Sequence, residues 1–449
     1  MKGLYRGGAI LATLTVAGGL LAGCGTGTNN ASNGTAGTNA TTNSTNTAAG
    51  SGAGGVVNIV WAAPPITHTG LRQTLISKFN AEHPNIHVTL QDQNSNTDTN
   101  RASLTTTIGG GAATPDVYMG DVVWPAQFAS NQLAMPLNGV VPSNFFNRFS
   151  KGLVQGATYQ GKVYAAPFFA DSGFLFYRKD LLKQAGLPVP TSWQQVQQEA
   201  ETLQKKGLVQ YGFVWQGASY EGLTCDFTEY LTDAGGQVLN SSGKAAIDSP
   251  QAIKALTFMR GLITSGVTPK SVINFQEPQS EDVFVQGNAA FLRNWSYAWS
   301  DSQNNKSSKV VGKVGVTVLP TFGGASGYST IGGWDLYINP HTQHTQAAVT
   351  FIDWMTNTQA QTILAKQFSE IPTNAQVAND PSVQAVSPIF GLVSKTHYVS
   401  RPDQNPNYPA ISKALYTNVN AALTGSVSVS AALQQAQTQI NQAASGGGL

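Results

Sequence analysis

After its first 55 residues, the sequence alternates short apolar runs with stretches of helical periodicity. Apolar or alternating runs predict strands, and apolar residues spaced along one helical face predict helices. The predicted strands cover residues 56–61, 86–90 and 117–119, and the predicted helices cover residues 71–79 and 124–130. This strand-helix-strand-helix order is typical of the α/β class, in which a parallel sheet carries helices on both faces.

Two further signals concern a ligand site and a helix start. Asp121 follows the third predicted strand, and ligands of open α/β sheets bind beyond the carboxyl ends of strands. Asp121 is therefore a candidate binding residue. Thr191 and Gln194 predict a capping box at the start of a later helix, and residues 430–444 predict the last helix.

The N-terminal segment has a composition of its own. A positively charged start precedes an apolar run at residues 9–21, which is too short for a convincing membrane span and predicts a secretory signal peptide. The sequence Leu-Ala-Gly-Cys24 resembles the processing box of bacterial lipoproteins, which implies a signal peptide over residues 1–23 and a lipidated Cys24. Residues 24–55 are almost entirely Gly, Ser, Thr, Asn and Ala, so we expect a flexible tether there.

Composition limits what the remaining chain can bind. Residues 56–449 amount to about 390 residues, which is too many for one core and suits two lobes. The net charge is +2 and only 11% of the residues are charged, which argues against nucleic acid and weakly against an anionic substrate. A low charge density with many uncharged polar residues leads to the hypothesis that the protein works in an acidic medium.

The cysteines and histidines predict no cofactor and no metal site. The chain has two cysteines, and with Cys24 acylated no disulfide can form. Cys225 lies in an apolar helical pattern and is expected to be a small buried residue. His83 and His87 are four residues apart, but Pro84 between them prevents a shared helical face, so a zinc site is not predicted.

Carboxylates near turns or aromatic residues leave two interpretations open. A glycosidase needs two carboxyl groups across a sugar bond. Passive sugar binding needs carboxylates that accept hydrogen bonds from hydroxyl groups and indole faces that cover apolar C–H surface. Both interpretations predict a carbohydrate. The carboxylates are those of Asp121, Asp171, Glu221, Asp226, Glu229 and Asp335, and the densest aromatic group is the run "NWSYAW" at residues 294–299.

Four blocks of sequence resemble extracellular solute-binding proteins of ABC sugar importers, in particular the trehalose- and maltose-binding proteins. The blocks are "PFFADSGFLFYRKDLL" (167–182), "YGFVWQGASYEGLTCDFTEYL" (211–231), "GNAAFLRNWSYAW" (287–299) and "IGGWDLYINP" (331–340). The resemblance implies two α/β lobes joined by a three-segment hinge, with crossings near 169–172, 331–334 and 371–372. It further implies an N-terminal lobe of residues 56–170 and 333–371, and a C-terminal lobe of residues 171–332 and 372–449.

The resemblance also implies a site and partners. A sugar, most simply a disaccharide, would bind between the lobes of a monomer and pass unaltered to the permease subunits of the importer, on the extracellular face of the membrane. By their position in matching motifs, the implied ligand contacts are Arg101, Asp121, Asp171, Trp295, Tyr297, Gly333, Trp334 and Arg401. Trp299 matches no such role and is expected to pack behind the other aromatic residues, while Trp215 and Glu221 are left open.

Two positions depart from the family pattern. Phe169 and His68 are further candidate ligand-binding residues, but Phe169 stands where a tyrosine is expected, and His68 or a neighbouring threonine stands where an acidic residue is expected. A site that pairs sugar hydroxyl groups strongly penalises an unpaired group, so either change could alter which sugar fits. Two other functions stay open at this point: a secreted glycoside hydrolase, and a sugar sensor or adhesin without a transport role.

Overall fold

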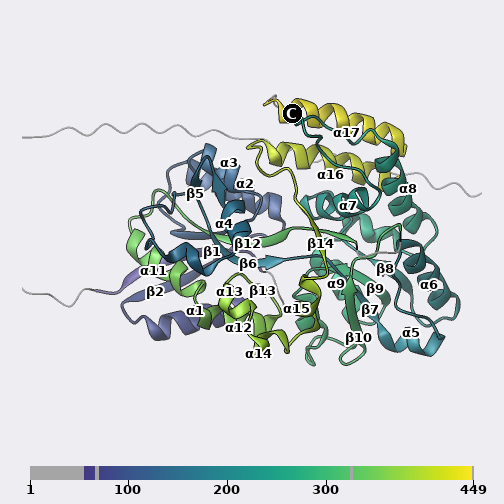
Figure 1. Cartoon of the computed structure of the whole chain (residues 1–449), viewed down its shortest axis with the longest axis horizontal. Helices are drawn as coiled ribbons and strands as arrows, with labels where there is room; N and C mark the ends of the chain where they lie inside the picture. The colour runs from purple at the N-terminus through teal and green to yellow at the C-terminus, as the bar shows by residue number, and fades with distance from the viewer. Residues whose placement is uncertain (1–54, 66–69, 324–326, 447–449) are drawn as a thin grey trace, which may run out of the picture. The chain divides into compact units, whose positions relative to one another are not determined.

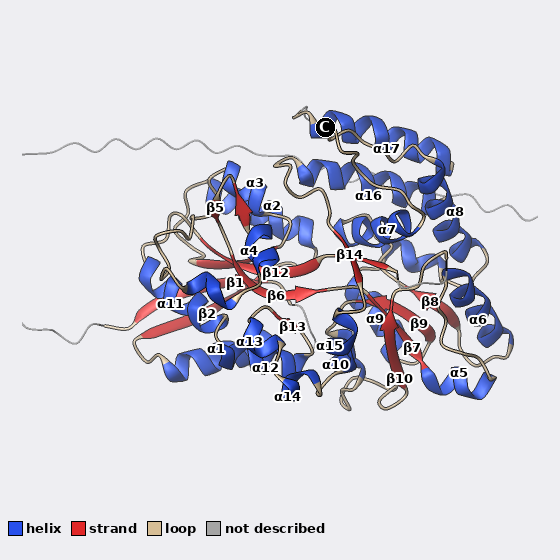
Figure 2. Cartoon of the chain, in the orientation of Figure 1, coloured by secondary structure: helices blue, strands red, loops and turns tan. Residues whose placement is uncertain are grey.

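The structure is a computed structural model that describes residues 55–65, 70–323 and 327–446. Figures 1 and 2 show its helices and strands. β1 (Val57–Ala63) pairs in parallel with β2 (Ile86–Asp92) and with β3 (Val117–Asp121). α1 (Leu71–Glu82) and α2 (Thr97–Gly109) connect these strands. The sequence predicted the three strands and α1 but ended each of them too early, and it did not predict α2.

These strands belong to a six-stranded sheet in the order β13-β6-β12-β3-β1-β2. β12 (Gly332–Ile338) runs antiparallel to both β3 and β6 (Ala166–Asp171), and β13 (Ile371–Pro372) runs antiparallel to β6. The expectation of a parallel sheet therefore holds for β1 to β3 and is wrong for the rest. Successive strands are parallel when a helical crossover connects them. β12 is not connected to β3 in this way, because the strands of the second sheet lie between them in the sequence.

Helices cover this sheet and bury two apolar clusters against it. Trp61, Phe79 and Phe351 lie at the centre of the larger cluster, in edge-on aromatic contacts. The remaining elements of this part are α3 (Pro125–Ser130), the 3-10 helix η1 (Phe145–Arg148), α4 (Lys151–Gly156), β4 (Thr158–Tyr159), β5 (Lys162–Val163), α11 (Thr345–Met355), α12 (Thr358–Phe368), α13 (Ala375–Ala378) and α14 (Pro381–Gln384).

A four-stranded sheet in the order β10-β7-β9-β8 forms the second lobe. Its strands are β7 (Phe174–Arg178), β8 (Tyr211–Val214), β9 (Ala289–Asn294) and β10 (Val314–Val318). Its helices are α5 (Lys179–Ala185), α6 (Trp193–Lys205), α7 (Glu221–Asp233), α8 (Pro250–Thr264), η2 (Lys270–Asn274), α9 (Glu277–Val285), α10 (Ala298–Ser302), α15 (Pro388–Val393), α16 (Tyr408–Thr424) and α17 (Val429–Ala444).

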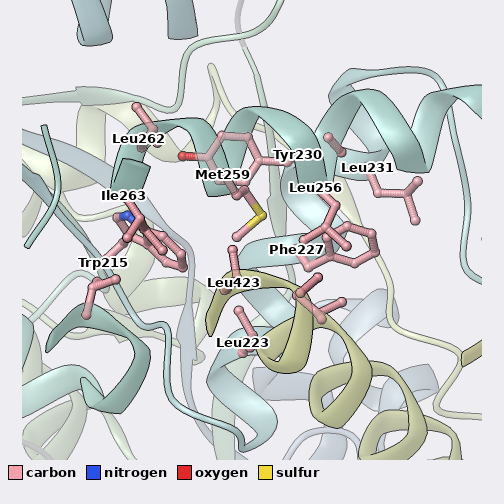
Figure 3. Close-up of a cluster of buried hydrophobic side chains, with 14 of the residues drawn as sticks. Trp215, Leu223, Phe227, Tyr230, Leu231, Leu256, Met259, Leu262, Ile263 and Leu423 are labelled. Carbon is pink, nitrogen blue, oxygen red and sulfur yellow. The ribbon is translucent and has the colours of Figure 1, made fainter. Parts of the chain in front are cut away.

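The core of the second lobe lies where α7, α8 and α16 meet. Leu223 and Phe227 of α7 face Leu256 and Met259 of α8, and Leu423 of α16 completes this layer (Figure 3). α7 is buried along most of its length, including its polar residues. A helix buried on all sides normally carries only apolar residues, so its polar side chains must find partners inside the protein.

The chain passes between the sheets at two close points. β6 ends at Asp171 and β7 begins at Phe174, while a single residue, Ile331, separates β11 (Tyr328–Thr330) from β12. β11 also pairs in parallel with β14 (His397–Val399). A third crossing was expected at residues 371–372, but α13 and α14 after β13 still pack with α12 of the first lobe. The detailed lobe boundaries stay a prediction.

The capping box of α6 lies one residue later than predicted. Ser192 is the N-cap residue, with its Oγ accepting a hydrogen bond from the backbone N–H of Gln195 at 3.2 Å. The side chain of Gln195 accepts a hydrogen bond from the backbone N–H of Ser192 at 3.1 Å. Thr191 and Gln194 were wrong as the pair, because Thr191 with Gln194 and Ser192 with Gln195 both have the spacing of a capping box.

Candidate functional site

A cleft opens between the two sheets, and the space between its side chains, including the opening to solvent, is about 700 Å³. This volume is in the range of small-molecule binding sites. Residues of both lobes and of the two connecting segments surround it. They are Pro65, Ser95, Thr97, Asp121, Asp171, Glu221, Gly222, Cys225, Glu277, Pro278, Trp295, Tyr297, Gly332, Gly333, Trp334 and Arg401.

Asp121 and Arg401 form an ion pair in one wall of the cleft. Asp121 is the last residue of β3, where the sequence predicted a ligand site. Arg401 lies between β14 and α16, and its Nη2 is 3.1 Å from Oδ1 of Asp121. Nη2 also donates to the backbone carbonyl of Ile331 at 3.0 Å. The guanidinium therefore holds Asp121 next to one of the two connecting segments.

Glu221 shares the same guanidinium from the other lobe. Its Oε1 lies 2.7 Å from Nη1 of Arg401, and its Oε2 accepts a hydrogen bond from Oγ of Ser412 at 2.6 Å. Tyr408 also donates a hydrogen bond to Oε1. Burial raises the pKa of Glu221 to about 7, against the opposing effect of Arg401. Glu221, left open by the sequence, is thus a residue of the cleft.

The two lobes also touch directly at this end of the cleft. The backbone N–H of Glu221 donates to Oδ2 of Asp98 on α2 at 3.0 Å. Arg101 pairs with the other oxygen, Oδ1 of Asp98, at 3.4 Å. Burial raises the pKa of Asp98. Arg101 was expected to contact the ligand, but it is not among the residues that line the cleft, because its guanidinium is turned to Asp98.

Asp171 occupies the floor of the cleft at the end of β6. Its Oδ1 accepts hydrogen bonds from the backbone N–H groups of Ser172 at 2.8 Å and of Ser296 at 2.9 Å. Burial nevertheless raises the pKa of Asp171 to about 6. Because these bonds tie β6 to the segment after β9, Asp171 links the first lobe to the aromatic run of the second.

Aromatic residues reach the cleft from both lobes. Trp295 is half-buried at the end of β9, and its Nε1 is 3.4 Å from Oε1 of Glu277. Trp334 on β12 meets Trp124 edge-on with ring centroids 6.1 Å apart. Tyr297 also lines the cleft, although only 5% of it is exposed.

Glycines allow the backbone to approach this aromatic group. Gly333 has φ +125°, and a Cβ there would lie 2.4 Å from the carbonyl oxygen of Phe169. No other residue fits at such a position. Phe169 itself is 1% exposed in the core of the first lobe and does not line the cleft, contrary to its predicted role. Its strand is buried on both faces, so its side chain packs inward.

Seven of the predicted contacts come together at the cleft, namely Asp121, Asp171, Trp295, Tyr297, Gly333, Trp334 and Arg401. His68 and Cys24 lie outside the described residues. Trp299 does not line the cleft and packs beside the second sheet, and Trp215 is fully buried. Cys225 is buried as predicted, and it is also one of the residues that line the cleft.

Several lining residues carry no pattern that sequence reasoning used. Glu277 begins α9 directly before a proline, Ser95 precedes α2, and Thr97 is the first residue of α2. A signal was present in Glu277-Pro278, because an acidic residue and proline are both favoured in the first turn of a helix. Locating the start of α9 at the cleft, however, requires the tertiary structure.

The chemistry of the cleft favours an uncharged, hydroxyl-rich ligand. Four carboxylates border it, and the guanidinium of Arg401 is already engaged by two of them. An anion would meet uncompensated negative charge, whereas hydroxyl groups can donate to carboxylates and backbone carbonyls. Among the described residues, no group of three or more His, Cys, Asp or Glu side chains is placed to hold a metal ion. Asp226 and Glu229 are turned away, since both contact Arg293.

Two α/β lobes with a ligand cleft between them define the class of receptors that bind a solute between two domains. The sequence profile of the bacterial extracellular solute-binding proteins matches residues 66–362. The chain therefore belongs to that family. It is a binding protein and not an enzyme, and none of the helices in the described ranges has the length and hydropathy needed to cross a bilayer.

Similar proteins agree with this assignment. A probable ABC transporter-binding protein of Deinococcus radiodurans is 34% identical over 343 residues, which cover 74% of this chain and 81% of the relative. The mannitol-binding protein of Pseudomonas aeruginosa is 24% identical over 393 residues, covering 81% and 88%. The maltose-bound structure of MalE3 from T. maritima is 34% identical, with a TM-score of 0.80, and covers 86% of this chain and 99% of that one.

Proposed function

We propose that this protein captures a neutral saccharide, most simply a disaccharide such as maltose or trehalose, and delivers it to the membrane subunits of an ABC importer. The observation that carries the proposal is one cleft that combines two indole rings, Trp295 and Trp334, with the carboxylates of Asp121, Asp171 and Glu221. Indole faces cover the C–H surface of a sugar ring, and carboxylates accept hydrogen bonds from its hydroxyl groups. The maltose carried by a structural relative supports the same ligand class.

Binding would act through the connections between the lobes. A ligand that touches both lobes stabilises the closed arrangement by its differential contact with it. Arg401 and Glu221 already join the lobes through short contacts, so hydroxyl groups placed beside them would add to an existing bridge. The closed form would then be the state that the permease subunits distinguish.

The proposal is tested by titrating the purified protein with maltose, trehalose, sucrose, glucose, mannitol and maltotriose while following tryptophan fluorescence. We expect saturable binding of at least one saccharide. W295A and W334A should each raise its Kd about tenfold or more, which corresponds to about 1.4 kcal/mol. W299A is the matched control, because Trp299 does not line the cleft, and its Kd should stay within twofold. No response to any of these compounds would contradict the proposal.

The place of the protein in the cell is part of the proposal. We infer that Cys24 is lipidated and that residues 24–55 tether the receptor as a monomer to the extracellular face of the membrane. The inference rests on the leader sequence. C24A should move the protein from the membrane fraction to the medium. A C24A protein that stays with the membrane would contradict the lipid anchor.

A further inference from the structure

Arg293 lies beneath the aromatic run without reaching the cleft. It occupies β9 two residues before Trp295, and only 2% of it is exposed. Its Cζ lies 4.2 Å from the centroid of the Trp295 ring, so the guanidinium stacks under the indole. Such a contact between an arginine and an indole is attractive, and it is strengthened when water is excluded.

The edges of this guanidinium are held in place by hydrogen bonds. Nε and Nη2 donate to the two carboxylate oxygens of Glu229 at 2.9 and 2.5 Å. Nη1 donates to Oε1 of Gln216 at 2.9 Å, and Oδ1 of Asp226 lies 3.1 Å from Nε. A guanidinium donates in its own plane. These partners therefore fix the orientation of the plane and leave its face to contact Trp295.

The carboxylate that anchors Arg293 also holds the segments between the lobes. Oε1 of Glu229 accepts hydrogen bonds from the backbone N–H of Thr330 at 3.1 Å and from its Oγ1 at 3.0 Å. The neighbouring Ser329 accepts a hydrogen bond from the backbone N–H of Gly173 at 2.6 Å. A Cβ at Gly173 would lie only 2.7 Å from Nη2 of Arg293. The Arg293–Glu229 pair is thus packed against both close crossings of the chain.

Charge neutralisation alone does not require an arginine at this position. A lysine could neutralise Glu229 and Asp226, but its ammonium is a point charge without a flat face and cannot donate in a two-pronged fork. Arg293 uses both features, because its fork donates to Glu229 and its flat face contacts Trp295. Trp295 is confined on a second side by the backbone, because a Cβ at Gly332 would lie 2.7 Å from its Cζ3.

We propose that Arg293 is a positioning residue that sets the orientation of the Trp295 indole in the cleft and, through Glu229, connects this ring to the chain crossings at residues 172–173 and 329–331. The proposal rests on the proposed function in one respect, that Trp295 contacts the saccharide. Arg293 itself touches no ligand. It acts on affinity through Trp295, and a change in the ring position is passed to the segments about which the lobes move.

A double-mutant cycle tests this coupling, with maltose as the probe. R293K should raise the Kd for maltose at least tenfold, and R293K/W295A should have the Kd of W295A within twofold. R178K is the matched control. Arg178 is also buried in the same sheet and forms a fork with Asp180 at 2.8 and 2.6 Å, but it is not at the cleft. R178K should lose a comparable amount of stability and keep its Kd within twofold.

A second variant tests the same coupling if R293K cannot be studied. If R293K does not fold, E229Q replaces it, because the amide preserves shape and removes one acceptor of the fork. E229Q should raise the Kd at least threefold, and only when Trp295 is present. A Kd effect of R293K or E229Q that persists in the W295A background, or no effect at all, would overturn the proposal.

A measurement without ligand separates this proposal from the proposed function. The fluorescence of Trp295 is obtained as the difference between each protein and its W295F counterpart. We expect this difference spectrum, and its quenching by acrylamide, to change in R293K and not in R178K. If the unmodified protein binds none of the saccharides, the proposed function fails and this spectrum still decides the role of Arg293. An unchanged spectrum would overturn that role even where maltose binds.

Discussion

The positions of single side chains at the cleft depend on how closely neighbouring atoms can pack against them. Trp295 lies between the guanidinium of Arg293 and the backbone of Gly332, and Gly333 permits β12 to pass against the carbonyl of Phe169. A rigid indole held in this way loses little conformational freedom when a ligand binds, which reduces the free-energy cost of binding. The affinity of the site should therefore be sensitive to residues that never contact the ligand.

Gly332 provides a direct test at this scale. G332A places a methyl group within 2.7 Å of Cζ3 of Trp295, so the ring must move. We expect the Kd for maltose to rise about tenfold, or about 1.4 kcal/mol, with the fold retained. G261A is the control, because a methyl group at this position, in the last turn of α8, meets open space and should add about 0.5–1 kcal/mol of stability without changing the Kd. Maltose binding by G332A at the original affinity would contradict this placement of the ring.

Asp335 gives a second prediction at the residue scale. It is 4% exposed on β12, and burial raises its pKa to about 8. Between about pH 4 and pH 8 the folded state keeps this proton and the unfolded state releases it, so stability falls as pH rises through that window. D335N removes the ionisation. We expect D335N to unfold at a higher temperature than the original protein at pH 8.5 and at a similar temperature at pH 4.5. Equal differences at both pH values would contradict this effect.

Sequence reasoning located part of the site, and the reasons are specific. Asp121 could be predicted as a cleft residue from its place after a strand, and the other predicted residues that line the cleft followed from the family resemblance. Arg293 was not predicted, because an arginine in a strand is usually exposed and its partner Glu229 is 64 residues away. Phe169 and Arg101 were placed at the ligand by motif position, but the inward packing of β6 and the carboxylate of Asp98 determine where their side chains lie.

At the scale of elements, α7 organises the second lobe. Its first residue, Glu221, reaches the cleft, while Asp226 and Glu229 reach Arg293 one and two turns later. Buried charges are costly unless they are paired, and each of these carboxylates has an arginine partner. One helix therefore fixes both the lobe-joining contact at Arg401 and the support of the aromatic run. Its apolar periodicity was visible in the sequence, but the pairing of its acidic residues was not.

The start of α6 offers a prediction for one element. Ser192 is the N-cap residue there, although the sequence favoured Thr191. S192A should cost about 1 kcal/mol of unfolding free energy, because the N–H of Gln195 loses its acceptor. T191A is the matched comparison and should cost less, since it removes only a partly exposed side-chain contact with Gln195. Urea unfolding measures both, and maltose affinity should not change. A larger cost for T191A would contradict the observed cap.

At the scale of the whole molecule, local sequence patterns predict many of the strands and helices, but they do not predict the cleft. The strands β1 to β3 were predictable from periodicity, because each is an apolar run between turns. β12 and β13 enter the first sheet only after the second lobe has formed, and no local pattern encodes that return. The residues of the cleft come from segments that are far apart in the sequence, so their meeting depends on the complete fold.

Stability of the whole protein should fall as pH rises from about 5 to about 8. Burial raises the pKa of Asp171 to about 6, of Glu221 and Asp233 to about 7, and of Asp335 to about 8. Each of these groups binds a proton more tightly in the folded state than in the unfolded state, where its pKa is about 4. The folded state therefore loses relative stability as pH rises between those values. We expect the thermal midpoint to fall by roughly 5 °C or more over this range.

The acidic limit of the same profile has a different cause. Hydrogen bonds from Trp354 to Glu82 and from Ser382 to Asp380 lower the pKa of each carboxyl group, so their contribution is lost as pH falls below about 4. Glu82 and Asp380 lie at the surface, whereas the groups with raised pKa are buried. The buried groups should therefore have the larger effect on how stability changes with pH. The maximum of stability is then expected near pH 4.5, and the same measurement tests the hypothesis of an acidic medium. Thermal unfolding between pH 3.5 and 8.5 measures the profile, and a midpoint that rises from pH 5 to pH 8 would contradict it.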